Sequence, residues 1–438
     1  MTPVRRIALV VVLAAPPGGV LAQERTGAAE PLQLAALQRA ARDADARARE
    51  LGLLTSQANL RVRNIDVERL PSVSALGQSQ YQSDVPTAPF TLPNGEPAFA
   101  PPHFTYDASL RADERLFDPS IDARRALVRA DAAESQSRVR TALFALRQEV
   151  NDAFFAAALL QEQLGAVAAS IDDLDARLRE TAARVREGTA LAGEAAAVEA
   201  TLLRSRQQAD ELGAARAAAL ARLARLTGAP VAADARMALP DLTAAVAGAR
   251  ATLEAQRARP EYDQFDRARD RVARQEDVAA AADRPQLSAF GRVGYGRPGL
   301  NFISDRAETY ALGGVQLQWK AWTWGASSRE REALAIQREI VAAEEAAFTN
   351  GVRRAIESDL ASIDRLRGAL ASDDRIVELR GAIDRAARAR LREGATTAAD
   401  YVDRQTELVT AEFERARHRV ELAAAHARVL TTLGLEVQ

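Results

Sequence analysis

Four segments of the chain alternate apolar and polar residues with a period of two, which is the pattern of β-strands with one wet face. In the segment 104–112 the apolar positions are Phe104, Tyr106, Ala108, Leu110 and Ala112. The segments 73–81, 287–295 and 315–320 alternate in the same way. We therefore expect two β-hairpins, at about 72–115 and 286–320. A loop over 84–103 with six prolines, which forbid helix and ladder, joins the strands of the first hairpin.

The two faces of these strands differ enough in polarity to suggest a side that faces lipid. Leu110, Val293 and Leu317 belong to the apolar set, whereas Gln80 and Gln318 belong to the polar set. The chain has three tryptophans, Trp319, Trp322 and Trp324, and all lie where the last strand ends, as in an interfacial aromatic belt. A soluble antiparallel sheet with one wet face is the alternative. In a membrane, four strands cannot close a barrel, so two or three copies must combine to give eight or twelve strands.

Two proline-free stretches predict helices too long to be buried within one compact globule. They run over about 121–186 and 326–392, and shorter helical stretches follow at about 191–226 and 397–433. Apolar residues between positions 159 and 178 recur every three or four residues, which is the spacing of a coiled-coil seam. The helices must therefore pair antiparallel, with the turns at Gly188 and Gly394 as free tips.

The sequence is duplicated in tandem. Arg186-Glu187-Gly188 recurs as Arg392-Glu393-Gly394, and Leu226-Thr227-Gly228 faces Thr432-Leu433-Gly434, in both cases 206 residues later. Each half runs in the order strand, loop, strand, long helix, turn, helix. We expect a first repeat over 23–230 and a second over 259–438, each opening with a helix. The connector 231–258 should hold a short helix near Leu242 to Arg257.

The first segment reads as a secretory signal. Arg5 and Arg6 precede an apolar run from Ile7 to Ala15, and small residues end the segment at Ala22. The run is far shorter than the roughly 20 residues of a transmembrane helix, which is the alternative. We expect residues 1–22 to be removed and Gln23 to begin the mature chain. The absence of cysteine excludes disulfides and a lipidated N-terminal Cys, and favours a bacterial envelope.

Composition narrows the function classes further. Lys and Arg total 58 against 60 Asp and Glu, so the net charge of −2 gives no reason to expect a nucleic-acid partner. With no cysteine and three histidines, neither a metal site nor another cofactor site is expected. No phosphate loop, nucleophile elbow or acid pair in a cleft-forming context occurs, so we expect a protein that is not an enzyme.

Motifs at the strand-to-helix junctions resemble a known family. Leu116-Phe117-Asp118-Pro119 and Trp322-Thr323-Trp324-Gly325 occupy the two junctions, and Arg259-Pro260-Glu261 opens the second half. Together with the tip glycines and the duplication, this order resembles the TolC-type outer-membrane efflux and secretion channels over essentially the whole mature chain.

The resemblance implies a mainly α fold with membrane β-strands. Three chains would form a twelve-stranded β-barrel in the outer membrane, continuous with an α-helical barrel that crosses the periplasm. Such a homotrimer is the passive exit duct of a tripartite efflux pump or a type I secretion system. Its partners would be a periplasmic adaptor (membrane fusion) protein, an inner-membrane transporter and outer-membrane lipid.

The resemblance also assigns residues near the second tip to a periplasmic gate. Asp400 and Asp403 lie six and nine residues after Gly394, where family members that match this spacing place their entrance aspartates. Repeated three times around a narrow mouth, they would form the negative ring of a cation-selective pore. The first repeat has Glu194 and Ala197 at the equivalent positions, so it would not add a full second ring. A solvated helix face is the alternative.

The tips resemble the valine-glycine motif that adaptors engage in this family. They read Glu187-Gly188-Thr189 and Glu393-Gly394-Ala395, with Glu in place of the valine in both repeats. A tight turn is the simpler role of the glycine and is compatible with docking. Some members lock the closed state through a Tyr three residues before the second tip glycine and an Arg two after it. Here Leu391 and Thr396 stand at those positions, so that lock is missing.

A second function class stays open at this point. A periplasmic coiled-coil structural or adaptor protein would also have a signal peptide and a long helical hairpin. An adaptor should carry a single helical hairpin between small β modules, without a duplicated hairpin of strands. The duplication therefore favours the channel.

Overall fold

The computed structural model describes residues 30–86, 90, 93, 101–250, 257–301 and 306–437. The expected signal peptide, residues 1–22, lies outside the described residues, as does most of the proline-rich loop.

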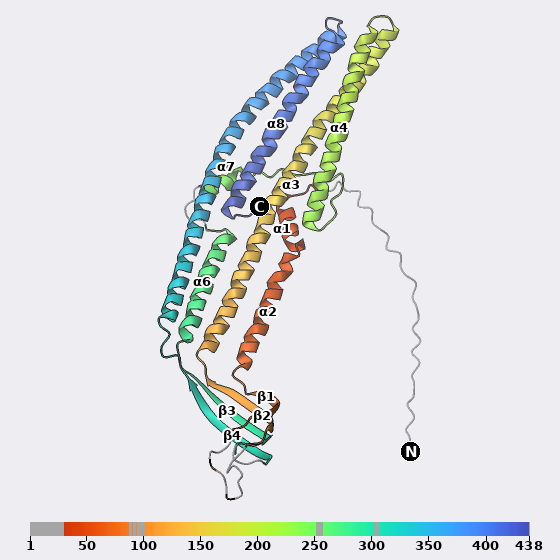
Figure 1. Ribbon diagram of the computed structural model, residues 1–438. Coiled ribbons are helices and arrows are strands. Elements are labelled where there is room, and N and C mark those ends of the chain that lie inside the picture. Colours follow the sequence, from red (N-terminus) through yellow and green to blue (C-terminus); the bar gives the residue numbers. More distant parts are fainter. Residues whose placement is uncertain are drawn as a thin grey trace, which may run out of the picture.

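The molecule is elongated, with a small sheet at one end and two helical turns at the other (Figure 1). The first half of the chain comprises α1 (Leu34–Ala44), α2 (Arg47–Val67), β1 (Ser72–Tyr81), β2 (Phe104–Phe117), α3 (Ser120–Arg186) and α4 (Ala192–Thr227). The second half comprises α5 (Thr243–Arg250), α6 (Pro260–Ala281), β3 (Gln286–Arg297), β4 (Glu308–Gln318), α7 (Ala326–Arg392) and α8 (Ala398–Leu433).

The four strands form one antiparallel sheet in the order β1-β2-β3-β4, so β1 and β4 lie at its edges. Leu110 lies directly opposite Val293, and Leu287 lies opposite Leu317, so these four apolar residues share one face as expected. Leu110, Val293 and Leu317 are all exposed on this face. Gln80 and Gln318 lie on the other face, which is rich in polar side chains.

The last strand is shorter than its sequence pattern suggests. β4 ends at Gln318, so Trp319 and Lys320 belong to the linker before α7 rather than to the strand. The indole Nε1 of Trp319 donates a hydrogen bond to the Asp283 carbonyl at 3.0 Å. This contact directs the chain toward the corner between α6 and β3, where the ladder ends.

The helices repeat the duplication seen in the sequence. α3 and α7 each have 67 residues, and α4 and α8 each have 36. Each long helix packs against the shorter one that follows it. Near the sheet the helices lie side by side in the order α2, α3, α6 and α7, and toward the tips α3 and α8 are neighbours (Figure 1).

The main core lies midway along the helices, where α1, α5 and the segment around Met237 pack on α3, α4 and α8. Val150, Phe154, Leu223, Ile363 and Leu430 are almost completely buried there. An 18-residue window of α3 is apolar enough to cross a membrane by length and composition alone. Only 28% of this window is buried, and Phe154, Phe155 and Ala158 of the same helix form part of the core.

The segment before the first hairpin holds two helices rather than one. The backbone of Asp45 is extended between α1 and α2. Its carboxylate accepts hydrogen bonds from the Arg47 backbone N–H and side chain, both at 2.8 Å, which stabilises the break. In the connector, α5 is the expected short helix, and residues 251–256 lie outside the described residues.

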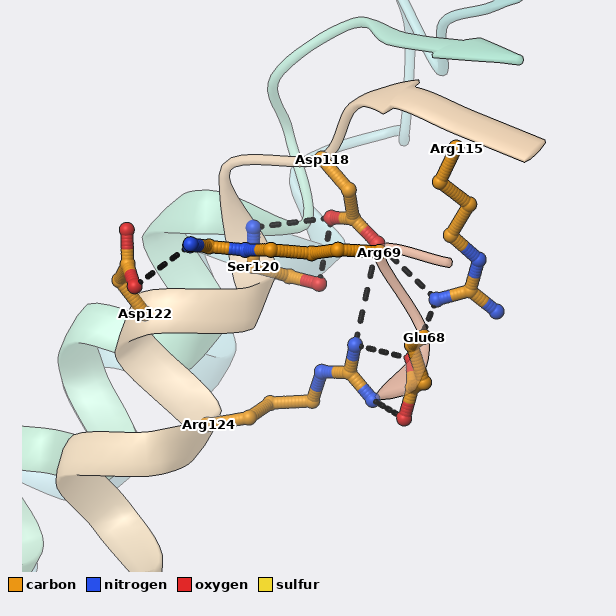
Figure 2. Close-up of polar contacts among 7 residues, drawn as sticks. All are labelled: Glu68, Arg69, Arg115, Asp118, Ser120, Asp122 and Arg124. Atoms are coloured by element: carbon orange, nitrogen blue, oxygen red, sulfur yellow. Dashed lines mark hydrogen bonds and ion pairs between the residues drawn. The ribbon is translucent and has the colours of Figure 1, made fainter. Parts of the chain in front are cut away.

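A cluster of charges fixes the junction between the sheet and the helices (Figure 2). The buried carboxylate of Asp118 accepts hydrogen bonds from the Ser120 backbone N–H at 2.9 Å and from Arg115 at 3.1 Å. Glu68, at the end of α2, binds Arg124 through both carboxylate oxygens and also contacts Arg115. Although burial opposes ionisation, the hydrogen bonds from Ser120 and the nearby arginines lower the pKa of Asp118. The cluster joins α2, β2 and α3.

Candidate functional site

The two helical tips have the same backbone geometry. Gly188 and Gly394 have φ angles of +71° and +72°, which strongly favour glycine. In the first tip the N–H of Thr189 bonds the Arg184 carbonyl at 2.9 Å, and in the second the N–H of Ala395 bonds the Arg390 carbonyl at 2.8 Å. This is the Schellman motif, which satisfies carbonyl groups at the end of a helix. The turn role of both glycines is therefore established, and the Glu-Gly pairs project at the end of the molecule.

Asp400 has a structural task at the start of α8. Thr397 is the N-cap residue, and its side chain accepts a hydrogen bond from the Asp400 N–H at 3.2 Å. In return, the Thr397 hydroxyl donates to Asp400 Oδ2 at 2.8 Å, and the Thr396 hydroxyl donates to the same oxygen at 3.2 Å. The hydrogen bond from Thr397 lowers the pKa of Asp400, which is therefore held as a carboxylate.

Asp403 lies one turn further along α8 and is exposed. Among the described residues its carboxylate has neither a hydrogen bond nor an ion pair. Glu194 lies in the first turn of α4 and is half-buried, and the N-cap position there is Leu191, which offers no side-chain cap. The two repeats therefore differ: only the second has a capping box and a second, unpaired carboxylate.

A polar network that the sequence did not reveal joins three helices behind the tips. Asp173 of α3 accepts a hydrogen bond from the Tyr401 hydroxyl of α8 and pairs with Arg388 of α7 at 3.1 Å. Arg388 also contacts Asp384 at 3.2 Å. Arg177 stacks over the Tyr401 ring, with its guanidinium carbon 5.4 Å from the ring centre. The two helical hairpins are thus held together within one chain.

Burial dominates the electrostatics of this network. It raises the pKa of the Tyr401 hydroxyl, and the hydrogen bond to Asp173 raises it further. Burial also raises the pKa of Asp384. Burial acts to lower the pKa of Arg388, but Tyr401, Asp173 and Asp384 together raise it above its ordinary value. Tyr401 therefore stays a neutral donor and Arg388 a cation.

Leu391 and Thr396, which stand at the two expected lock positions, make other contacts at the tips. Leu391 is buried in a cluster with residues from all four long helices. The buried members of the cluster are Leu174, Val198, Leu202, Leu391, Ala398, Tyr401 and Val402. Arg184 adds a polar link, because its guanidinium donates to the Leu391 carbonyl at 3.2 Å. Thr396 binds Asp400 instead of forming an inter-helix contact.

The two histidines of α8 make structural contacts. No group of three His, Asp or Glu residues among the described residues could hold a metal ion. His418 Nδ1 lies 2.5 Å from Asp373 Oδ2, and His426 is buried with an Nε2 atom that has no hydrogen-bond partner. His418 and His426 therefore belong to the packing between α7 and α8 and to the core.

The tryptophans that we predicted for the membrane interface lie at the end of α7 that is far from the tips. Trp319, Trp322 and Trp324 occupy the linker between β4 and α7 and are all exposed. The structure therefore places the predicted residues in two groups: tips and carboxylates at one end, and tryptophans at the junction with the sheet (Figure 1).

Comparison with known proteins gave matches among solved structures. No protein-family model and no curated protein matches the sequence. CusC, whose crystal structures describe transmembrane channel formation, has a TM-score of 0.68 and 14% identity, covering 92% of this chain and 92% of that chain. The outer membrane protein VceC from Vibrio cholerae has a TM-score of 0.67 and 13% identity, covering 92% and 97%. The MtrE outer membrane channel of Neisseria gonorrhoeae, in its open state, has a TM-score of 0.65 and 16% identity, covering 92% and 89%.

These similarities concern the fold as a whole rather than a local motif. Because each match covers 92% of this chain, it includes both repeats, both strand hairpins and both helical hairpins. The sequence resemblance and the three-dimensional likeness agree. The chain has the fold of the TolC-type outer-membrane channels.

Proposed function

We propose that three copies of this chain form an outer-membrane channel that serves as the exit duct of a tripartite efflux pump or a type I secretion system. The four strands of each copy would contribute to a twelve-stranded barrel. The helices would continue as a tube into the periplasm. Substrate would arrive from an inner-membrane transporter and a periplasmic adaptor and pass through without chemistry.

The observation that carries the proposal is the open sheet with one exposed apolar face. β1 and β4 each end the sheet, so each leaves a row of backbone groups without partners in the sheet. Leu110, Val293 and Leu317 are exposed on the same face. In lipid an open edge is not tolerated, and pairing of β1 with β4 of the next copy removes both edges at once.

The edge helices support the same lateral contact. In α2 the exposed apolar residues Leu53, Leu60 and Val67 are seven positions apart, which is a heptad spacing. α7, at the other edge, exposes Ile336 and Ile340 four positions apart. Contact between these unlike edges is heterologous, and a threefold rotation closes such contacts into a ring.

The tips would form the periplasmic end of this tube. With threefold symmetry the unpaired Asp403 would give three carboxylates around the mouth, and Asp400 would add three more next to them. Such a ring attracts cations and would favour their passage. The Glu-Gly tips at 187–188 and 393–394 would be the surface for the adaptor, and the Glu in place of valine would set its chemistry.

A periplasmic adaptor or structural protein is the weaker candidate. It would have no need for a sheet that exposes several leucine and valine side chains on one face. It would also gain nothing from two helical hairpins of identical length on one chain. Both features are present here.

Cysteine cross-linking tests the proposal, because the natural chain has no cysteine to interfere. Pairs with one cysteine on β1 and one on β4 should cross-link between chains in outer-membrane vesicles and give a ladder that ends at three chains. Pairs on β2 and β4, which are two strands apart in one sheet, are the control and should not cross-link. Membrane-inserted protein that gives no inter-chain product with any β1–β4 pair would overturn the proposal.

A further inference from the structure

We propose that the linker between β4 and α7, residues 319–325, is a binding site for anionic phospholipid headgroups, with Trp322 and Trp324 as its apolar wedge and Lys320 as its cation. This inference rests on the proposed membrane location and gives it a specific ligand class. It concerns the end of the sheet next to the helices (Figure 1).

Exposure is the first observation. Trp324 and Trp322 are 81% and 75% exposed, the two highest values among the exposed large apolar side chains of the described residues. Their rings meet edge to face, with centroids 5.8 Å apart, so they act as one aromatic unit. Trp319 is also 59% exposed and continues the apolar alternation of Val315 and Leu317. Three exposed indole rings therefore lie within six residues of the end of β4.

The backbone holds this exposed pair in a costly conformation. Trp324 has φ +53° and is the one non-glycine residue with positive φ in the described part of the chain. A bulky residue in this region of backbone space is strained. Gly, the residue usually found at such a position, follows at 325 with φ +73°. A tryptophan that is strained and almost unburied gains little from folding, which points to a contact outside the chain.

The linker is nevertheless firmly held. Arg329 donates to the Trp324 carbonyl at 3.1 Å, and Ala326 N–H donates to the Thr323 carbonyl at 3.0 Å. Asp283 anchors both ends, because its carbonyl accepts from Trp319 at 3.0 Å and its carboxylate accepts from Ser327 at 2.5 Å. The aromatic wedge is thus presented by a fixed turn.

Charge identifies the ligand class. Lys320 is the single lysine of a chain with 58 basic residues, and it lies between two of the tryptophans. It is exposed and has no ion pair among the described residues. The sequence holds no acidic residue between Glu308 and Glu330, and the carboxylate of Asp283, which lies against the linker, is bound to Ser327. An indole ring favours the interfacial region of a bilayer, and a compact ammonium favours phosphate, so an anionic phospholipid satisfies both groups.

Fluorescence can test this site directly, because the three tryptophans of the chain all lie in it. The full chain would be reconstituted in phosphatidylcholine vesicles that contain phosphatidylglycerol brominated near the glycerol end of its acyl chains. We expect strong quenching of tryptophan emission by the brominated lipid and weak quenching by aqueous acrylamide. The relative affinity for phosphatidylglycerol over phosphatidylcholine should fall about fivefold in Lys320→Gln and recover in Lys320→Arg.

Trp324→Gly separates a structural role from lipid binding. Since glycine adopts positive φ without strain, this variant should be at least as stable as the natural chain. It should nevertheless bind lipid more weakly and retain less quenching. A marked loss of thermal stability with unchanged lipid affinity would show that the ring serves the fold, and the proposal would be wrong.

Two other outcomes would also overturn the proposal. Strong acrylamide quenching without lipid quenching would place the linker in water. Protection from both quenchers would mean that a neighbouring copy covers it. The cysteine ladder, measured on the same vesicles, distinguishes these failures from failure of the proposed function: a trimer without lipid quenching rejects the lipid site alone.

Discussion

The guanidinium of Arg388 on α7 lies 3.1 Å from the carboxylate of Asp173 on α3, which also accepts a hydrogen bond from Tyr401 on α8. These contacts connect the two tandem repeats near their tips. Residues from three helices must meet in one partly buried place for this to occur, so each member depends on the others.

Loss of the Tyr401 hydroxyl should loosen the tips. Tyr401→Phe leaves the half-buried Asp173 with one donor fewer, which we expect to destabilise the local structure by about 1 kcal/mol. Hydrogen exchange of the backbone amides near residues 170–180 and 384–392 should become faster. Asp173→Asn should act in the same direction. Asp172→Asn is the matched control, because Asp172 is its exposed neighbour on the same helix, and equal exchange in both variants would refute the role of the network.

The two faces of the sheet should respond differently to the same substitution. Leu76 and Leu110 are 51% and 53% exposed, but Leu76 pairs with Ser109 and therefore lies on the polar face. Leu110→Arg should impair membrane assembly, with a cost of about 2–4 kcal/mol if the residue lies near the bilayer midplane. Leu76→Arg should be tolerated, as should Gln80→Arg and Gln318→Arg. Assembly yield in outer-membrane vesicles measures the difference, and similar yields for both leucine variants would contradict the assigned register.

The two carboxylates of the second tip should separate into a capping and a gating role. In a planar bilayer, Asp403→Ala should weaken the block by trivalent metal complexes applied from the periplasmic side and lower cation selectivity, without faster exchange at the start of α8. Asp400→Ala should reduce block and cation selectivity in the same way, and it should also speed exchange at the start of α8, because it removes the capping box. Thr397→Ala is the control for the cap alone, with a cost of about 1 kcal/mol and unchanged block.

Glu194→Ala should have a smaller effect on block than either aspartate variant. Unchanged block and selectivity in the variant that combines Asp400→Ala with Asp403→Ala would assign the constriction to other residues.

Stability should fall at mildly acidic pH because of His426. Burial lowers the pKa of His426, and Arg367 lowers it further. The folded state therefore binds this proton less readily than the unfolded state, so the free energy of unfolding decreases as pH falls through about 6.5, the ordinary value for His. His426→Leu should flatten this slope in thermal unfolding between pH 7 and 5. An unchanged slope would mean that other groups produce it.

Much of the architecture follows from sequence pattern alone. The period-two segments located all four strands, and the proline-free stretches located α3 and α7, because these elements depend on local alternation and on helix breakers. The tip glycines were recognisable because a turn between antiparallel helices requires positive φ. The break at Asp45 was missed, since it depends on one side chain that bonds its own neighbourhood.

The candidate site was only partly predictable. Thr397-x-x-Asp400 carries the spacing of a capping box, and this signal could have shown the structural role of Asp400 in advance. The network around Asp173 could not be found in this way. Asp173 is more than two hundred residues away from Arg388 and Tyr401 in sequence, and the three meet because of the rotation of three helices about their own axes.

Counting the chains in a membrane-inserted particle tests the central claim most directly. The full chain would be reconstituted in lipid nanodiscs, released and weighed by native mass spectrometry. A trimeric channel predicts a mass of three chains for every stable particle. A stable particle with one chain, inserted in lipid with β1 and β4 unpaired, would contradict the proposed barrel.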